Sequence, residues 1–225
     1  VGFFIDGAAP FTGANVRAYA TGVILEYVGN FDHSPPMTTA ALPISVEPRF
    51  VYNQEFRSIY AITPGVIMLT LILIPAMLTA LGVVREKEIG SIVNLYASPA
   101  TIGEFLLGKQ LPYVGVAMLS YFSLTLTTIL VLGVPLRGSF VALSLGALFF
   151  ILAVTALGLL ISALVRSQVA AIFGTAIICL VPAVNFSGVL YPISTLTGGG
   201  YLVGVGFPSS WFQIVSLGCF TKGLG

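Results

Sequence analysis

Ionisable side chains are scarce in this sequence of 225 residues. Charged residues make up 8% of the chain and hydrophobic residues 57%, with a mean hydropathy of +1.03 and a formal net charge of +1. Soluble domains carry about 25% charged residues, so the composition indicates a bilayer rather than water as the main surroundings. Direct binding of nucleic acid is not expected, because phosphate binding requires clustered basic side chains.

Histidine and cysteine are also rare. His33 is the single histidine and lies in a Pro-rich segment without a second potential ligand, while Cys179 and Cys219 form neither a disulfide framework nor a metal set. Hydrolytic triads and metal catalysis therefore lack their parts. We expect no catalytic residue, no cofactor and no metal site in this chain, and no enzyme activity of its own.

The segment that precedes the first long uncharged run carries many of the polar residues of the chain. Residues 1–57 are predicted to form a small, partial α+β domain. It would contain a strand at VGFFID, a helix capped by Asn15 that runs through VRAYATGVILEYV, and a strand within LPISVEPRFVYN. The sequence begins at Val1 without a basic segment before an apolar run, so we expect no signal peptide and interpret the chain as a fragment.

Residues 58–225 are predicted to form a transmembrane domain. Four uncharged runs are long enough to cross a hydrocarbon core of about 30 Å, where lipid forces the backbone into helices. The uncharged residues 191–221 are interrupted by proline and glycine, so we expect a re-entrant or interfacial hairpin there. The predicted spans are 59–84, 111–134, 140–165 and 169–190.

The predicted spans contain no Asp, Glu, Lys, Arg or His. Carriers that couple transport to an ion usually place an ionisable residue at the midplane, so this pattern argues against a self-powered carrier. If residues 1–57 lie outside, most basic residues near the spans lie inside and only Arg137 occupies a short external loop, in agreement with the positive-inside rule. The residues then inside are Arg85, Lys87, Lys109 and Arg166.

A charged segment, residues 85–110, separates the first two spans and is predicted to be a cytoplasmic loop. A short amphipathic helix is expected in REKEIGSIVNLY, and Thr101 with Glu104 forms a capping box that begins the next helix. The charges could merely set the topology, or their alternating sign could match a protein surface. GEFLLGKQ, Gly103 to Gln110, approaches a phosphate-binding loop, but Gln110 replaces the required hydroxyl and no strand precedes it.

LTALGVVREKEIGSIVNLYASPATIGEFLLGKQLPY resembles the cytoplasmic loop of type-2 ATP-binding-cassette exporter permeases, in the bacterial branch of multidrug-type permeases and the membrane part of the ribosome-associated ATPase. EPRFVYN, VREKE-G and SGVLYPIS extend the resemblance over most of the chain. It implies six spans per protomer, a second protomer, and a coupling helix seated in a nucleotide-binding domain. The first and last spans and the cassette are not evident in this sequence. The residues that match the coupling segment are Arg85, Glu86, Lys87, Glu88, Gly90 and Ser91.

Two further sets of residues are candidates for function or packing. Asn185, with Phe186 and Tyr191, would line a substrate pathway, or Asn185 would only bond a neighbouring helix or the backbone freed by Pro182. Gly158 and Ser162 have the small-xxx-small spacing of closely packed membrane helices.

The fold class that we predict is mainly α: a polytopic helical membrane protein with the type-2 ABC exporter transmembrane fold and a small α+β extracytoplasmic domain. The predicted function is a permease in the bacterial inner membrane that moves a hydrophobic or amphipathic substrate outward. The expected partners are a nucleotide-binding domain that hydrolyses ATP, a second permease protomer and membrane lipid. The alternative is a membrane anchor or assembly subunit, such as a tether for a ribosome-associated ATPase.

Overall fold

The computed structural model describes residues 3–6, 10–31, 48–51, 58–91, 101–190, 193 and 196–223. The chain is mainly helical and divides into two compact units, residues 1–61 and residues 62–225. Each unit is described by itself below.

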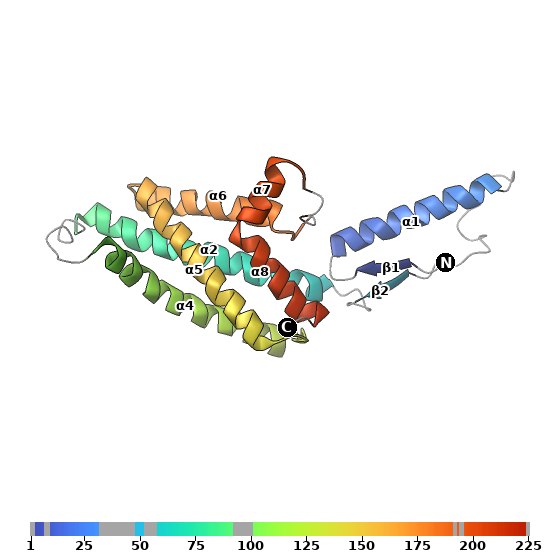
Figure 1. The fold of residues 1–225 in the computed structure, drawn as a ribbon, viewed down its shortest axis with the longest axis horizontal. Coiled ribbons are helices and arrows are strands. Elements are labelled where there is room, and N and C mark those ends of the chain that lie inside the picture. The colour runs from blue at the N-terminus through green and yellow to red at the C-terminus, as the bar shows by residue number, and fades with distance from the viewer. Residues whose placement is uncertain are drawn as a thin grey trace. The chain divides into compact units, whose positions relative to one another are not determined.

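The first unit contains two strands and a long helix (Figure 1). β1 (Phe3–Asp6) pairs in parallel with β2 (Pro48–Val51), with Phe3 opposite Pro48 and Asp6 opposite Val51. α1 (Pro10–Phe31) follows β1. The predicted helix start at Asn15 was wrong, because the helix begins at Pro10, whose fixed φ suits a first turn, and Asn15 lies inside it.

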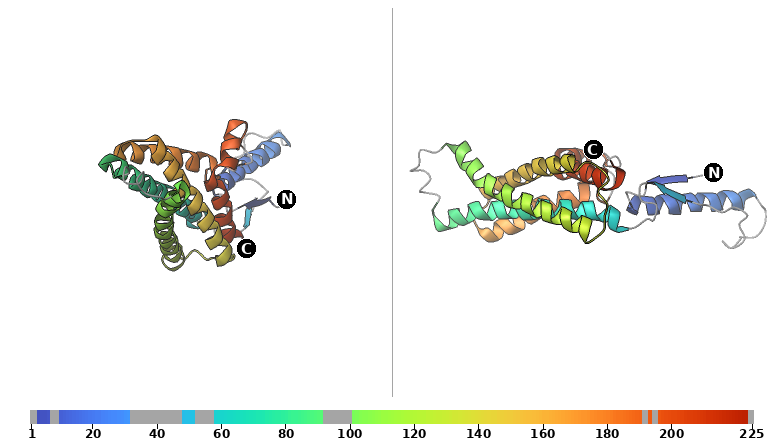
Figure 2. Two further views of the ribbon diagram at one scale, coloured as in Figure 1. Left: turned by 60° about the vertical axis from the view of Figure 1, so that its left-hand side comes forward. Right: turned by 90° about the horizontal axis from the view of Figure 1, so that it is seen from below.

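Four long apolar helices dominate the second unit, and each overlaps one predicted span (Figures 1 and 2). The helices and the predicted spans disagree mainly in the residues at which each helix begins and ends. Pro64, Pro75, Pro112 and Pro182 lie inside these helices. The four are α2 (Ser58–Ile89), α4 (Ile102–Leu130), α5 (Phe140–Leu164) and α6 (Gln168–Phe186).

The start of α4 confirms the predicted capping box. The Thr101 hydroxyl oxygen accepts a hydrogen bond from the Glu104 amide at 3.3 Å, and the Glu104 carboxylate accepts one from the Thr101 amide at 2.8 Å. The helix therefore begins at Ile102, so residues 102–110 are helical rather than part of a loop. Gly103–Gln110 lies in this helix and has no phosphate-binding loop geometry.

The end of α2 differs from the prediction. The helix continues through the charged residues to Ile89, so the loop that was predicted to start at Arg85 starts later. Glu and Lys are good helix formers, and Gly90, with φ +78°, supplies the left-handed residue that ends a helix. Residues 85–89 are thus the last turn of α2, and the rest of the predicted amphipathic helix lies outside the described residues.

Close approach of α5 and α2 forms the centre of the second unit. A Cβ atom on Gly158 of α5 would lie 2.4 Å from the carbonyl oxygen of Ala76 in α2, so only glycine permits this crossing. Ser162, one turn further along α5, is also buried. The predicted close packing at this small-residue pair is confirmed. α5 also packs against α4 and α6.

The last part of the chain is a bent pair of helices. α7 (Gly199–Gly206) is followed by α8 (Pro208–Leu217) and a π-helical turn (Gly218–Lys222), and the two helix axes differ by 68° at Phe207. The pair is long and apolar enough to be either a broken span or a re-entrant loop. The carbonyl oxygen of Cys219 accepts hydrogen bonds from the amides of Arg137 and Gly138, at 3.1 and 2.8 Å, so α8 ends beside the α4–α5 connection.

Candidate functional site

The last turn of α2 carries four consecutive charged residues, Arg85 to Glu88. We call these residues and their partners on other helices the charged cluster. The side chains of Glu86, Lys87 and Glu88 are bonded to three different helices.

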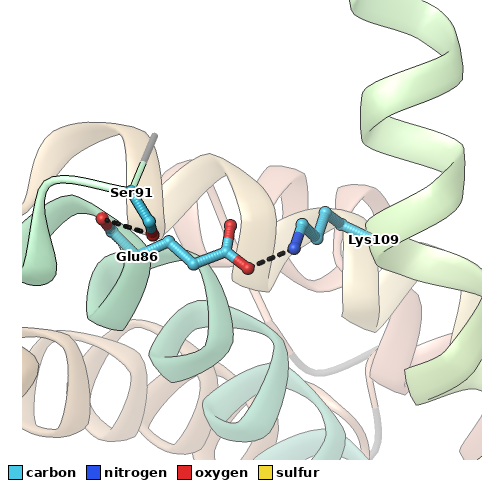
Figure 3. Close-up of polar contacts among 3 residues, drawn as sticks. All are labelled: Glu86, Ser91 and Lys109. Atoms are coloured by element: carbon cyan, nitrogen blue, oxygen red, sulfur yellow. Dashed lines mark hydrogen bonds and ion pairs between the residues drawn. The ribbon is translucent and has the colours of Figure 1, made fainter. Parts of the chain in front are cut away.

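Glu86 joins α2 to α4. Its carboxylate forms an ion pair with the Lys109 ammonium group, and the two side chains are 31% and 30% exposed (Figure 3). The Lys109 nitrogen also lies 5.9 Å from the centroid of the Phe105 ring. On the backbone of the same turn, the Ser91 hydroxyl donates to the Glu86 carbonyl oxygen at 3.3 Å. Glu86 therefore holds the first turns of α4 against the end of α2.

Lys87 joins α2 to α5. Its ammonium group donates to the carbonyl oxygen of Ser162 at 2.5 Å. Ser162 lies in the last turn of α5, which ends at Leu164, so this carbonyl has no amide partner within the helix. A cation is favourable at a helix C-terminus because it complements the negative end of the helix dipole.

Glu88 joins α2 to α6. Its carboxylate accepts hydrogen bonds from the backbone amide of Gln168 at 2.7 Å and from the side-chain amide of Gln168 at 2.5 Å. Gln168 is the first residue of α6, and the Ser167 hydroxyl caps the same helix by accepting from the Ala170 amide at 3.2 Å. An anion at a helix N-terminus complements the positive end of the helix dipole.

The alternating sign of the charges follows from these partners. α5 ends and α6 begins within the short connection 165–167, so a negative and a positive helix end lie next to each other. Lys87 and Glu88 are adjacent in sequence and match these two ends in sign. The sequence left open whether the alternating charges set the topology or match a partner surface, and it did not indicate these contacts within the chain.

The remaining predicted coupling residues face outward. Arg85, Gly90 and Ser91 are exposed, and Arg85 makes no hydrogen bond or ion pair with the described residues. The six predicted residues thus divide into three whose side chains bond to other helices, Glu86 to Glu88, and three that make no such contact, although Glu88 is itself exposed.

The predicted pathway residues are only partly brought together. The Asn185 side chain is exposed, and its amide donates to the Val181 carbonyl oxygen of its own helix at 2.9 Å. Phe186 is half-buried, and its ring lies 3.4 Å from the position of a Cβ atom on Gly200. Tyr191 lies outside the described residues. Within the described part of the chain, no three His, Cys, Asp or Glu residues are grouped to hold a metal ion.

Sequence reasoning missed a buried polar face on α8. Ser209, Ser210, Gln213 and Ser216 are all buried within this ten-residue helix. The sequence PSSWFQIVS shows these polar residues but does not show that they face the bundle.

Long apolar helices, with most of their charged residues at one end and Arg137 and Lys222 at the other, define a polytopic helical membrane protein. The chain belongs to the ABC-2 transporter family, because the family model described as "ABC-2 family transporter protein" matches residues 1–225. No solved structure matches the chain.

Three relatives from Escherichia coli strain K12 are similar to this chain. The probable multidrug ABC transporter permease YbhS is 31% identical over 191 residues, which are 85% of this chain and 50% of YbhS. The inner membrane transport permease YhhJ is 28% identical over 70% of this chain and 41% of YhhJ. The probable multidrug ABC transporter permease YbhR is 27% identical over 64% of this chain and 39% of YbhR. The chain therefore spans half or less of the length of these relatives.

Proposed function

We propose that this chain is the membrane part of an ABC exporter and moves a hydrophobic or amphipathic substrate outward across a bacterial inner membrane. ATP is hydrolysed on a separate nucleotide-binding domain, and a second permease protomer completes the pathway. The chain supplies moving helices rather than catalytic residues. The family match and the similarity to three proteins named as permeases support this proposal.

The observation that carries the proposal is the three-way bonding of the charged cluster. One helical turn of α2 is fastened to the start of α4, the end of α5 and the start of α6. A push on the segment after Ile89 therefore reaches three helices at once, as a rigid-body switch requires. In this mechanism the exposed Arg85, Gly90 and Ser91 contact the ATPase, and Glu86, Lys87 and Glu88 pass the displacement into the membrane.

The same proposal implies one orientation of the chain in the membrane. The charged cluster is cytoplasmic, and the 1–57 domain lies on the opposite, extracytoplasmic side. α6 starts at the cluster and runs away from it, while α8 ends beside residues 137 and 138 at the far end of α4. Because both helices end on the side away from the cluster, we assign α7 and α8 to a re-entrant loop, with residues 191–221 returning to the outer side.

A reconstitution experiment tests the proposal. The full-length protein and its ATPase are placed in liposomes, and ATP hydrolysis is measured with and without hydrophobic compounds. We expect stimulation by a transported compound, and we expect Arg85→Ala to reduce that stimulation. Arg166→Ala is the matched control, since Arg166 is also exposed and lies in the α5–α6 connection on the same side.

Crosslinking provides a test that is independent of the substrate. A Ser91→Cys variant should crosslink to a cysteine in the ATPase, whereas Leu132→Cys, exposed at the opposite end of α4, should not. Absence of any Ser91→Cys crosslink in every nucleotide state would show that this end of α2 does not touch the ATPase. Crosslinking without stimulation by any compound would instead favour the anchoring role.

A further inference from the structure

The polar face of α8 is not explained by contact with an ATPase. Ser209, Gln213 and Ser216 are spaced four and three residues apart, so they lie on one side of the helix. Their exposed fractions are 0%, 5% and 0%, whereas Trp211 and Ile214 on the opposite side are 60% and 56% exposed. α8 thus directs its polar side into the bundle and its apolar side outward, which is the reverse of a helix at the surface of a soluble protein.

Several oxygen atoms on this face have no partner. Ser210 is satisfied, because its hydroxyl donates to the Phe186 carbonyl oxygen at 3.2 Å. Four oxygen atoms are buried without a hydrogen-bond partner among the described residues. They are the hydroxyls of Ser187, Ser209 and Ser216 and the side-chain oxygen of Gln213. Buried polar atoms in proteins are almost always hydrogen-bonded, since burial without a bond is unfavourable.

Gln213 of this face lies beside α2 and Val189, and α8 packs along α5. The Gln213 amide nitrogen is 3.8 Å from the position of a Cβ atom on Gly65, and the Val189 side chain is 3.4 Å from the same position. The Phe212 ring stacks on Phe150 of α5 with 4.6 Å between the ring centroids. From this level α8 runs to the α4–α5 connection, at the end of the bundle away from the charged cluster.

We propose that the inner face of α8 binds ordered water and lines a hydrated path that opens at the end of the bundle away from the charged cluster. A buried water needs two to four polar partners, and the unpaired oxygens of Ser209, Gln213 and Ser216 supply them along one side of the helix. Hydroxyl and amide groups can both donate and accept hydrogen bonds, so this face suits water and other neutral hydrogen-bonding groups. This site exists whether or not the transport proposal holds.

Thiol accessibility tests the hydration of this face. Ser209→Cys and Ser216→Cys keep the size of the side chain, and they are made in full-length protein whose native cysteines are replaced by alanine. A small water-soluble methanethiosulfonate is applied to both sides of the membrane, so the result does not depend on the proposed orientation, and this reagent requires a thiolate in contact with water. Ala147→Cys, in the buried apolar part of α5, and Ile214→Cys, on the outward side of α8, are the controls.

We expect the two inner-face cysteines to react about tenfold faster or more than either control, because only they have access to water. Equal rates for Ser216→Cys and Ala147→Cys would overturn the proposal.

The thermal unfolding midpoints of Gln213→Met and Ser216→Ala are a second measurement that does not depend on labelling. On a hydrated face, both substitutions remove a partner of bound water and lower the midpoint. On a dry face, both remove an unpaired polar atom and raise the midpoint, which would also overturn the proposal.

Discussion

Reversal of the Glu86–Lys109 ion pair measures how firmly α4 is held to α2. Both side chains are about one-third exposed, so the pair contributes near the upper end of the 0.2–1 kcal/mol that is typical of exposed pairs. Glu86→Gln should therefore lower the free energy of unfolding by about 1 kcal/mol. Glu86→Lys places two ammonium groups together, with a repulsion of about 4 kcal/mol at 4 Å and an effective dielectric constant of 20.

The long side chains reduce this repulsion by turning toward water, so we expect a loss of about 2 kcal/mol for Glu86→Lys and a similar loss for Lys109→Glu. The double variant restores a pair of opposite charge and should lie within about 1 kcal/mol of the unmodified protein. Recovery is incomplete because Lys109 also lies over the Phe105 ring, a contact worth about 0.5–1 kcal/mol that glutamate cannot make.

The assay is thermal unfolding of the purified full-length protein in detergent, combined with substrate-stimulated ATP hydrolysis in liposomes. Each kcal/mol should move the midpoint by about 2–4 °C for a domain of 150–250 residues. Arg166→Glu is the control. It reverses a charge at the same end of the bundle, and Arg166 has no partner among the described residues. If the double variant is no more stable than either single variant, the ion pair does not hold α4 to α2, and this part of the coupling mechanism is wrong.

Three further substitutions test individual contacts by the same unfolding measurement. Thr101→Ala removes the hydroxyl that accepts from the Glu104 amide and donates to the Glu104 carboxylate, and should cost about 1 kcal/mol. Gly158→Ala should cost about 1–3 kcal/mol through its clash with Ala76, whereas Gly115→Ala, with open space around its Cβ position, should cost nothing. Glu88→Lys places a cation at the α6 N-terminus and should be more destabilising than Glu88→Gln, and an equal effect of the two would contradict the dipole argument.

The sequence predicted the long helices well because a single strong constraint governs them. An uncharged run in lipid must satisfy every backbone group internally, so run length alone indicates a helix. The capping box at Thr101 and Glu104 was equally predictable, since both of its bonds form between residues three positions apart. At Arg85 to Glu88 the helical conformation was predicted, but these residues continue the preceding span instead of beginning a separate helix in the loop.

The partners of the charged residues were not predictable, because they depend on how distant segments are placed. Lys87 and Ser162 are separated by 75 positions, and Glu88 and Gln168 by 80. No local sequence pattern indicates that the end of α2 lies beside the α5–α6 connection. The unpaired oxygens on α8 also required the structure, since polar spacing in sequence does not show which side of a membrane helix faces the bundle.

The contacts of the charged cluster are weak, which suits a conformational switch better than a permanent attachment. Its contacts are the pair Glu86–Lys109, one lysine on a helix C-terminus and one glutamate on a helix N-terminus, and each is weak because its side chains are partly or fully exposed to solvent. Together they fix three helices to one turn while that turn is at rest. Any one contact can be broken by a partner that binds only one state of the protein, because a few kcal/mol of differential affinity shift such an equilibrium. A buried, fully desolvated network would resist that change, whereas these side chains stay within reach of water and can exchange partners as the helices move.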